Sequence, residues 1–425
     1  MDKLKIEALN PMQKEVYPAI NSVRDVVLLS PTGTGKTLAY LLPVIEKLDA
    51  ACAGIQVLIL VPSRELAIQI EQVVREMGTG HKVNAVYGGR AGYQDKMDLK
   101  HTPAILIGTP GRLADLLRRA IFSTEFIRTL VLDEFDKSLE IGFEAEMKEI
   151  VAALPVKIKK ILTSATRGAE IPEFVGLKNP VVIDYLHEKI VQLKVKTIVS
   201  PSKNKLGTLV QALSHIGDQP GIVFCNFKES IQEVSDFLNV HHIHHGCFHG
   251  SMEQIDRERT LIKFRNGTLR LIVATDLAAR GLDIPELKFI IHYELPPRLQ
   301  EFTHRNGRTA RMNTDGTAFI LKWENESLPD FIGNVETEKL RKAPTPKPPV
   351  WETLYITGGR RDKISKGDIA GLFFKQGNIE KDQLGVIEIN QDCSYVAVHA
   401  SVADRLIEAV NNGKLKTKKV RVSLL

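Results

Sequence analysis

The sequence predicts an α/β protein in which two parallel-sheet domains stand in tandem before a small α+β domain. Short apolar runs alternate with amphipathic helical stretches, as in QVLILVP (56–62), PAILIGTP (103–110) and TLVLDE (129–134). This alternation is typical of parallel sheets covered by helices. The same rhythm restarts after about residue 200 with GIVFCN (221–226) and LRLIVATD (269–276). We therefore expect two similar parallel-sheet domains.

A proline-rich segment separates these domains from the third one. APTPKPPV (343–350) has four prolines in eight residues, which is typical of a semi-rigid linker. Residues 351–425 then read strand, helix, two strands, helix and strand, the βαββαβ order of a fold like the RNA recognition motif (RRM). We predict domains at 1–190 and 198–335, a linker at 336–350 and an RRM-like domain at 351–425.

Composition excludes several classes of protein. Of the 425 residues, 43% are hydrophobic and 25% charged, as in ordinary globular domains, and no stretch approaches the ~18 apolar residues that span a bilayer. The formal charge of +6 is compatible with a polyanionic partner. The cysteines form no CxxC pair, which favours reduced thiols in a cytoplasmic protein; they are Cys52, Cys225, Cys247 and Cys393. We expect no membrane association.

A phosphate-binding loop follows the first apolar strand. SPTGTGKT (30–37) comes after DVVLL and opens a helix at LAYLLP, the context that such a loop requires. Its glycines let backbone N–H groups approach phosphates, Lys36 can neutralise the β and γ phosphates, and Thr37 can bind Mg²⁺. The residues predicted to line this loop are Ser30, Pro31, Thr32, Gly33, Thr34, Gly35, Lys36 and Thr37. The alternative is a glycine-rich turn without a ligand.

An acidic motif supplies the second half of this predicted site. TLVLDEFD (129–136) is an apolar strand that ends in Asp133 and Glu134. One carboxylate can hold Mg²⁺ through water, and the next can orient the attacking water. A strand that ends in acidic residues is usually only solvated, but the phosphate loop upstream makes nucleotide hydrolysis the better interpretation.

Further blocks occur in an order that resembles the DEAD-box RNA helicases over residues 9 to 320. They include PSRELAIQ (62–69), TPGR (109–112), SAT (164–166), ATDLAARGLDIP (274–285) and HRNGRTAR (304–311), with DEFD in place of DEAD. The resemblance implies two RecA-like domains and ATP as the nucleotide. It implies that Gln13 reads the adenine and that Asp283 meets the ribose. The aromatic residue that the family places upstream of this glutamine to stack on adenine is missing here.

The resemblance also implies roles in hydrolysis and in coupling. Arg308 and Arg311 match the family's arginine fingers, which place positive charge on the γ-phosphate in the transition state, and His304 matches a residue of the water-positioning network. These residues lie in the second domain, so hydrolysis is expected only when the two domains close. Ser164 or Thr166 is expected to donate a hydrogen bond to Asp136 and so link nucleotide state to RNA binding.

Positions that match the family's RNA groove suit contacts to phosphates and 2′-hydroxyls rather than to base edges. They are Arg64, Gly89, Thr109, Gly111, Arg112, Thr275 and Arg280. The core is therefore expected to grip any single strand by its backbone and to bend it, so that a short duplex comes apart. Sequence preference must come from elsewhere.

The C-terminal domain is the expected source of that preference. YITGGRRDKISKGDIAGLF (355–373) and SYVAVH (394–399) resemble the RNA-binding domain of DbpA-type bacterial helicases, which implies recognition of a hairpin of large-subunit ribosomal RNA. Only Tyr355 and Tyr395 could stack on bases from the sheet. Two basic clusters are candidate RNA contacts, although charge runs are often only solvated surface; they are Arg360, Arg361, Lys363 and Lys366, then Lys414, Lys416, Lys418, Lys419 and Arg421.

The leading hypothesis is an ATP- and Mg²⁺-dependent RNA helicase that acts as a monomer on ribosomal RNA and pre-ribosomal particles. The alternative is an ATP-gated RNA clamp or a general RNA chaperone. An unwinding assay would distinguish the clamp from a helicase. A DNA helicase is disfavoured because the motif variants resemble the RNA branch. HHIHHGCFHG (241–250) could suggest a metal site, but its spacing matches no regular ligand set, and we predict none there.

Overall fold

The computed structural model describes residues 8–22, 25–89, 92–166, 170–187, 193–276, 287–309 and 315–425. The chain divides into two compact units, of which the first holds one parallel sheet and the second holds the other parallel sheet and an antiparallel sheet. Within the described ranges no helix combines the length and apolar character needed to cross a membrane.

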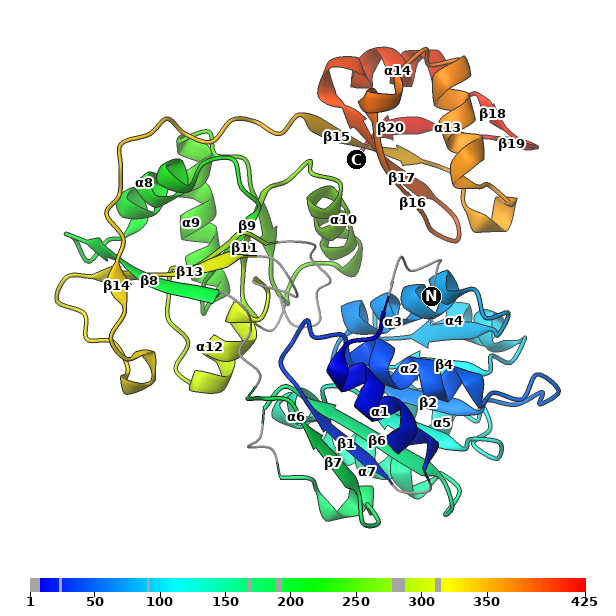
Figure 1. Ribbon diagram of the computed structural model, residues 1–425. Coiled ribbons are helices and arrows are strands. Elements are labelled where there is room, and N and C mark those ends of the chain that lie inside the picture. Colours follow the sequence, from blue (N-terminus) through cyan, green and yellow to red (C-terminus); the bar gives the residue numbers. More distant parts are fainter. Residues whose placement is uncertain are drawn as a thin grey trace. The chain divides into compact units, whose positions relative to one another are not determined.

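The first domain is a seven-stranded parallel sheet in the order β3-β4-β2-β5-β6-β1-β7. Its strands are β1 (Val26–Leu29), β2 (Val57–Leu60), β3 (Val83–Val86), β4 (Ile105–Gly108), β5 (Thr129–Leu132), β6 (Lys159–Ser164) and β7 (Val181–Asp184). Its helices are α1 (Pro11–Asn21), α2 (Lys36–Glu46), α3 (Arg64–Met77), α4 (Gly92–Leu99), α5 (Pro110–Arg118), α6 (Phe135–Glu140) and α7 (Glu144–Ala152). Figure 1 shows this sheet with helices on both faces.

Successive side chains along a strand of this sheet pack into two different hydrophobic cores, one on each face. Val57 and Ile59 pack with α1, α2 and α3 on one face, whereas Leu58 and Leu60 pack with α5 and α7 on the other. Because side chains alternate between the faces of a strand and both faces are covered, the strand must be apolar at every position. This is why the first domain's strands read as continuous apolar runs.

The second domain repeats the architecture, with the parallel order β10-β11-β9-β12-β13-β8-β14. Its strands are β8 (Leu193–Ser200), β9 (Gly221–Phe224), β10 (Gly246–Phe248), β11 (Leu271–Ala274), β12 (Phe289–His292), β13 (Gly316–Trp323) and β14 (Glu336–Thr337). Its helices include α8 (Leu206–Ile216), α9 (Lys228–Val240), α10 (Gln254–Arg265) and α12 (Leu299–Asn306). The two similar domains predicted from the alternation are therefore present.

Both predicted boundaries of the second domain need correction. The boundary at 198 falls inside β8, which begins at Leu193 and pairs with β13 along its whole length. The boundary at 335 cuts off β14, which pairs with β8 at the sheet edge. β8 begins with the alternation LKVK, which is a strand pattern that the predicted boundary excluded. β14 has only two residues, both exposed, so pairing alone identifies it as a strand.

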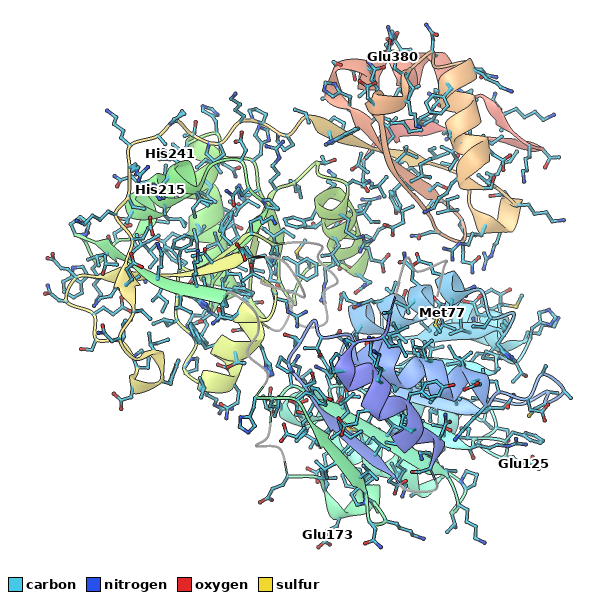
Figure 2. The ribbon with its side chains drawn as sticks, in the orientation of Figure 1. Met77, Glu125, Glu173, His215, His241 and Glu380 are labelled. Atoms are coloured by element: carbon cyan, nitrogen blue, oxygen red, sulfur yellow. The ribbon has the colours of Figure 1, made fainter. Side chains whose placement is uncertain are left out.

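The proline-rich linker lies along the second domain. His215, labelled in Figure 2, sits at the end of α8 and contacts Glu338 Oε1 through Nε2 at 3.2 Å, while its Nδ1 accepts a hydrogen bond from the Arg341 backbone at 3.0 Å. Further along, the Lys347 backbone N–H donates to Asp218 at 2.7 Å. These contacts fix the path of the segment over α8.

The C-terminal module has the predicted βαββαβ order with one added hairpin. Its antiparallel sheet runs β16-β17-β15-β20, and α13 and α14 pack on it around buried Leu354, Phe373 and Leu406. The elements are β15 (Trp351–Ile356), α13 (Lys366–Lys375), β16 (Leu384–Ile389), β17 (Ser394–His399), α14 (Ala403–Val410), the hairpin β18 (Lys414–Leu415) and β19 (Lys418–Lys419), and β20 (Val422–Leu424).

Candidate active site

The strand order of the first sheet brings three motifs together. The phosphate loop follows β1, the acidic motif follows β5, and SAT begins at the last residue of β6. Since β5, β6 and β1 are neighbours and parallel, the loops after them leave the same edge of the sheet. Ligands of open α/β sheets bind at this edge, beyond the carboxyl ends of the strands.

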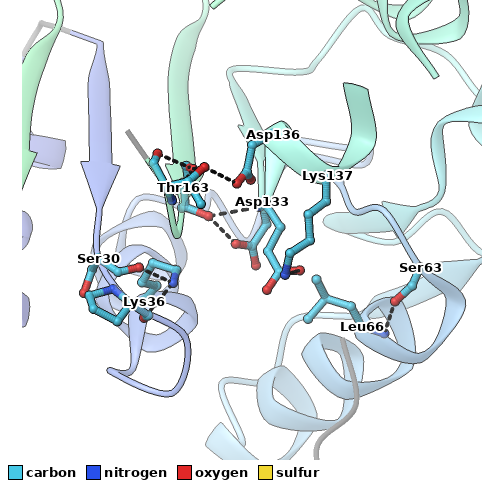
Figure 3. A network of polar contacts seen from close by, with 12 residues as sticks. Ser30, Lys36, Ser63, Leu66, Asp133, Asp136, Lys137 and Thr163 are labelled. Atoms are coloured by element: carbon cyan, nitrogen blue, oxygen red, sulfur yellow. Dashed lines mark hydrogen bonds and ion pairs between the residues drawn. The ribbon is translucent and has the colours of Figure 1, made fainter. Parts of the chain in front are cut away.

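Short contacts within the phosphate loop hold the Lys36 side chain (Figure 3). Lys36 Nζ donates to the carbonyl oxygens of Ser30 and Pro31 at 2.6 and 2.8 Å. Burial lowers the pKa of Lys36 to about 8, against the opposing effect of Glu134 and Asp133. The buried ammonium is therefore held at the start of α2, where phosphate oxygens could replace the two carbonyls.

Two glycines of this loop have a left-handed backbone, with φ of 80° at Gly33 and 88° at Gly35. A Cβ on Gly35 would lie 2.6 Å from Nε2 of Gln13. That amide donates to the Gly35 carbonyl at 3.3 Å, and Asn10 Nδ2 donates to the Thr34 carbonyl at 3.0 Å. The predicted adenine reader thus packs directly on the predicted phosphate loop, and α1 is held there by a capping box between Asn10 and Gln13.

The acidic motif is buried, and hydrogen bonds hold the Asp133 carboxylate and the Glu134 backbone. Asp133 Oδ2 accepts a 2.9 Å hydrogen bond from Tyr40, and Oδ1 accepts one from the hydroxyl of Thr163. Thr163 Oγ1 in turn accepts the backbone N–H of Glu134 at 3.1 Å. Burial, followed by the neighbouring charge of Glu134, raises the pKa of Asp133. Sequence reasoning missed Tyr40 and Thr163, because neither lies in a block that it assigned to chemistry.

The predicted link between SAT and the acidic motif is present as a contact. Thr166 Oγ1 donates to Asp136 Oδ2 at 2.9 Å. Ser164, the other candidate donor, instead donates its hydroxyl to the Thr166 carbonyl at 2.8 Å, which closes the turn. The contact therefore comes from Thr166, and Ser164 supports it. The coupling role itself stays a prediction.

The first-domain residues predicted to contact RNA form two groups. The Arg64 guanidinium lies against Gly89, since a Cβ there would be 2.6 Å from Nη1, although 25 positions separate them in the sequence. Thr109 is the N-cap residue of α5, which contains Gly111 and Arg112 in its first turn. Arg112 already donates to Asp95 at 2.7 Å and to Asp115 at 3.0 Å, so those carboxylates orient its side chain.

In the second domain, sequence reasoning overlooked a buried arginine, Arg305, which follows His304 directly in the chain. Arg305 donates to both oxygens of Asp276 at 2.6 and 2.5 Å, to the Glu294 carbonyl at 2.6 Å and to Asn226 at 2.7 Å. Its guanidinium also lies 5.0 Å from the centre of the Phe224 ring. Because these partners follow β11, β12 and β9, one side chain joins the ends of three adjacent strands.

His304 and Arg308, on either side of Arg305 in the sequence, are each 5% exposed. Thr275 follows β11, and its backbone N–H donates to the Phe248 carbonyl at 3.2 Å. Three predicted site residues lie outside the described residues, and their roles stay predictions; they are Arg280, Asp283 and Arg311.

In the histidine-rich segment, His241, labelled in Figure 2, packs on Phe237 at a ring distance of 4.4 Å.

The donor set at the acidic motif fits Mg²⁺ with bound phosphates. Across the described ranges no group of three or more His, Cys, Asp or Glu side chains could hold a metal ion by itself. Mg²⁺ commonly binds through one or two protein groups and completes its shell with water and substrate phosphates. The carboxylate of Asp133 and the hydroxyl of Thr37 are oxygen donors of that kind.

The module carries a single basic surface assembled from the two predicted clusters. Lys418 Nζ forms an ion pair with Asp362 at 2.7 Å, and Lys416 Nζ forms one with Asp368 at 3.1 Å and also donates to the Lys363 carbonyl. We call these residues the basic surface: Arg360, Arg361, Lys363, Lys366, Lys414, Lys416, Lys418, Lys419 and Arg421. All of them except Lys418 are exposed.

Of the two sheet tyrosines, Tyr395 offers little surface for stacking. Tyr355 and Tyr395 are directly opposite each other on β15 and β17, with ring centres 5.7 Å apart. Tyr395 is only 6% exposed. An RRM that stacks bases on its sheet needs accessible rings, so the basic surface is the better candidate for RNA contact.

Comparison with known proteins agrees with this division of the chain. Residues 10–174 match the DEAD/DEAH box helicase profile, 204–313 the helicase conserved C-terminal domain and 353–424 the DbpA RNA binding domain. The ATP-dependent RNA helicase DbpA of Escherichia coli (strain K12) is 32% identical over 451 residues, covering 100% of this chain and 96% of the relative. The protein of the same name from Bacillus subtilis (strain 168) is 30% identical, covering 97% and 94%.

Solved structures share the fold of the two parallel-sheet domains. Mss116p bound to single-stranded RNA and AMP-PNP has a TM-score of 0.67 and 25% identity, covering 76% of this chain and 71% of that one. Dbp5 of S. cerevisiae bound to RNA and ADP BeF3 has a TM-score of 0.67 at 24% identity, covering 75% and 84%. The second likeness speaks for the fold alone.

Proposed function

Because the chain belongs to the DEAD-box family of ATP-dependent RNA helicases, we propose that it remodels structured ribosomal RNA in pre-ribosomal particles during assembly of the large subunit. RNA-stimulated ATP hydrolysis follows from membership of the family. Support for the target comes from the match to the DbpA RNA binding domain at residues 353–424 and from the resemblance of this module to those that bind large-subunit ribosomal RNA. We infer that the protein works as a monomer in the cytoplasm.

In this proposal ATP is held by the first domain. Gln13 reads the adenine edge, the loop from Ser30 to Thr37 binds the phosphates, and Lys36 exchanges the Ser30 and Pro31 carbonyls for phosphate oxygens. Support comes from the buried, loop-bound Lys36 and from the packing of Gln13 on Gly35. Mg²⁺ supplies positive charge that stabilises the reacting phosphates.

Hydrolysis needs a carboxylate that directs water and cations that stabilise the transition state. We assign the first role to Glu134, with Asp133 and Thr37 on Mg²⁺. Arg308 and Arg311 of the second domain supply the cations, His304 supports them, and Asp283 meets the ribose. Thr166 and Asp136 transmit the nucleotide state to the RNA groove.

RNA is gripped in two places in this proposal. The core holds the strand through backbone contacts from Arg64, Gly89, Thr109, Gly111, Arg112, Thr275 and Arg280. The module selects the target through its basic surface. The observation that carries this assignment is the contact between the loop at 360–363 and the β18–β19 hairpin, which makes one basic surface from two separate clusters.

The test uses the full chain with charge reversal in the basic surface. We expect Lys363→Glu with Lys414→Glu to abolish the preference for ribosomal RNA over unstructured RNA in steady-state ATP hydrolysis at fixed salt. Each lost phosphate contact should also reduce the slope of log affinity against log salt by about 0.7 to 0.9. The matched control is Lys381→Glu, which reverses an exposed lysine of the same module.

The outcomes separate the two levels of the proposal. Loss of the preference in the double variant, with the control unchanged, supports the module as the part of the chain that recognises ribosomal RNA. Equal stimulation of the unmodified protein by both RNAs would leave a general RNA helicase. A duplex-unwinding assay distinguishes a helicase from a clamp, because a clamp would bind RNA with ATP and leave the duplex paired.

A further inference from the structure

Lys137 is a buried lysine directly after the acidic motif. Its side chain has 0% exposure, which places it among the largest fully buried side chains of the described residues. Removing an ammonium group from water costs several kcal/mol unless a carboxylate and further hydrogen bonds compensate it. A lysine in this position therefore needs a specific partner.

That partner is Glu134. Lys137 Nζ forms an ion pair with Glu134 Oε2 at 2.8 Å, and the glutamate side chain is itself only 10% exposed (Figure 3). The two residues are three positions apart at the start of α6, so they lie on the same side of one helical turn. The contact therefore fixes the end of a side chain that otherwise has three rotatable bonds.

The backbone of Glu134 is fixed as well. The residue has φ of 50° and ψ of 49°, a left-handed conformation that is uncommon outside glycine. Its N–H donates to Thr163 Oγ1 at 3.1 Å, and the same threonine hydroxyl donates to Asp133. Glu134 is thus held at its backbone by Thr163 and at its carboxylate by Lys137. Strained residues that the surroundings hold in place are concentrated at functional sites.

The two buried lysines of this site serve different elements. Lys36 donates to the carbonyls of Ser30 and Pro31 in the phosphate loop, whereas Lys137 contacts the acidic motif. Phosphate binding engages Lys36, so it leaves the pair between Lys137 and Glu134 to set the direction of that carboxylate. An oriented carboxylate lowers the barrier because the attacking water needs no reorganisation in the transition state.

We propose that Lys137 is a positioning residue for hydrolysis, which holds the Glu134 carboxylate in the orientation that directs the attacking water. This inference rests on the proposed role of Glu134. It distinguishes Lys137 from a lysine that only neutralises buried charge, since a positioning residue affects turnover without affecting nucleotide binding.

The decisive variant is Lys137→Met, which keeps the length and apolar stem and removes the charge. We expect kcat for RNA-stimulated hydrolysis to fall about 10- to 100-fold, the size of effect that misplacement of a reacting group produces. The KM for ATP and the affinity for AMP-PNP should stay within about twofold, because phosphate binding depends on Lys36. Lys137→Arg, which keeps a cation, should recover much of the rate.

A double-variant comparison tests the route of the effect. If Lys137 acts through Glu134, adding Lys137→Met to Glu134→Gln should slow single-turnover hydrolysis no further, since residues that act as a unit are not additive. Multiplicative losses would overturn the proposal. Lys148→Met is the matched control, because Lys148 is an exposed lysine of α7 in the same domain, and its kcat should be unchanged.

Each remaining outcome has a defined meaning. Unchanged kcat in Lys137→Met, or equal loss of kcat and of AMP-PNP binding, overturns the positioning role. If the methionine variant does not fold, Lys137→Gln replaces it in the same comparison, with folding checked by thermal unfolding. Absence of RNA-stimulated hydrolysis in the unmodified protein would contradict the proposed function itself, which is distinct from failure of this inference.

Discussion

Tyr40, in the helix after the phosphate loop, donates a 2.9 Å hydrogen bond to Oδ2 of Asp133, which lies 93 positions later in the sequence. Both side chains are buried. The bond joins the two halves of the nucleotide site directly. Burial, followed by the charge of Asp133, raises the pKa of Tyr40 well above its usual range, so the phenol stays a donor.

Replacing Tyr40 with Phe should weaken the fold and the metal site together. Removal of a buried hydrogen bond to a carboxylate costs about 1–3 kcal/mol, measurable by urea unfolding of the first domain. The Mg²⁺ concentration for half-maximal ATP hydrolysis should rise, because Asp133 loses one of its two anchors. Tyr17→Phe is the control: Tyr17 also bonds a carboxylate, Glu46, but at an exposed site, and neither quantity should change.

Replacing Gly35 with Ala should impair both stability and nucleotide binding. A left-handed backbone costs a non-glycine residue about 1–2 kcal/mol, and a Cβ at this position would lie 2.6 Å from Gln13. ATP affinity should fall about tenfold or more, equal to about 1.4 kcal/mol, in a direct binding assay. Gly80→Ala has the same backbone strain with φ of 81° but open space around it, so it should lose stability and keep ATP affinity.

Replacing Arg305 with Met should unfold or loosen the second domain. The variant leaves the Asp276 carboxylate, which is 24% exposed, and the partly buried Glu294 carbonyl without their donor, and each donor or acceptor left unsatisfied costs about 1–3 kcal/mol. RNA-stimulated hydrolysis should fall in parallel, because Arg308 follows the same helix. Arg259→Met removes an exposed pair with Asp256, at 3.6 Å, and should cost less than about 1 kcal/mol. Equal losses of stability in the two variants would show that Arg305 does not hold the three strand ends together.

Acid should destabilise the second domain through His292. Burial, and then the charge of Arg305, lowers its pKa to about 3, while its ring contacts Asn306 Oδ1 at 2.9 Å. The unfolded histidine has a pKa of about 6.5, so between the two values the unfolded chain binds a proton that the folded chain does not. The free energy of unfolding therefore falls as pH drops through this window.

His292→Gln removes that titration and serves as the comparison. We expect its unfolding free energy, measured in urea at pH 7 and pH 5, to decline less than that of the unmodified protein. The difference is at most about 1.4 kcal/mol per pH unit. Parallel declines in the two proteins would show that His292 is accessible to protons in the folded state.

Local patterns in the sequence were sufficient for much of the fold and for part of the site. The apolar run before SPTGTGKT and the apolar start of TLVLDEFD identified strands β1 and β5, because strands covered on both faces are apolar throughout. The glycines of the phosphate loop are recognisable for a similar local reason, since only glycine readily adopts the left-handed backbone seen at Gly33 and Gly35. Strand β8, inside the second sheet, and the edge strand β14 lack such a continuous apolar run.

The sequence by itself determined which motifs exist and at which end of a strand each one stands, because strand pattern and loop conformation depend on neighbouring residues. The tertiary structure alone decided which motifs meet. The order β5-β6-β1 joins Tyr40 and Thr163 to Asp133, and packing of the module joins Lys416 to Lys363. Such contacts join residues that are far apart in the sequence, and they depend on the order of the strands in the sheet. The alternation of apolar and polar residues does not encode that order.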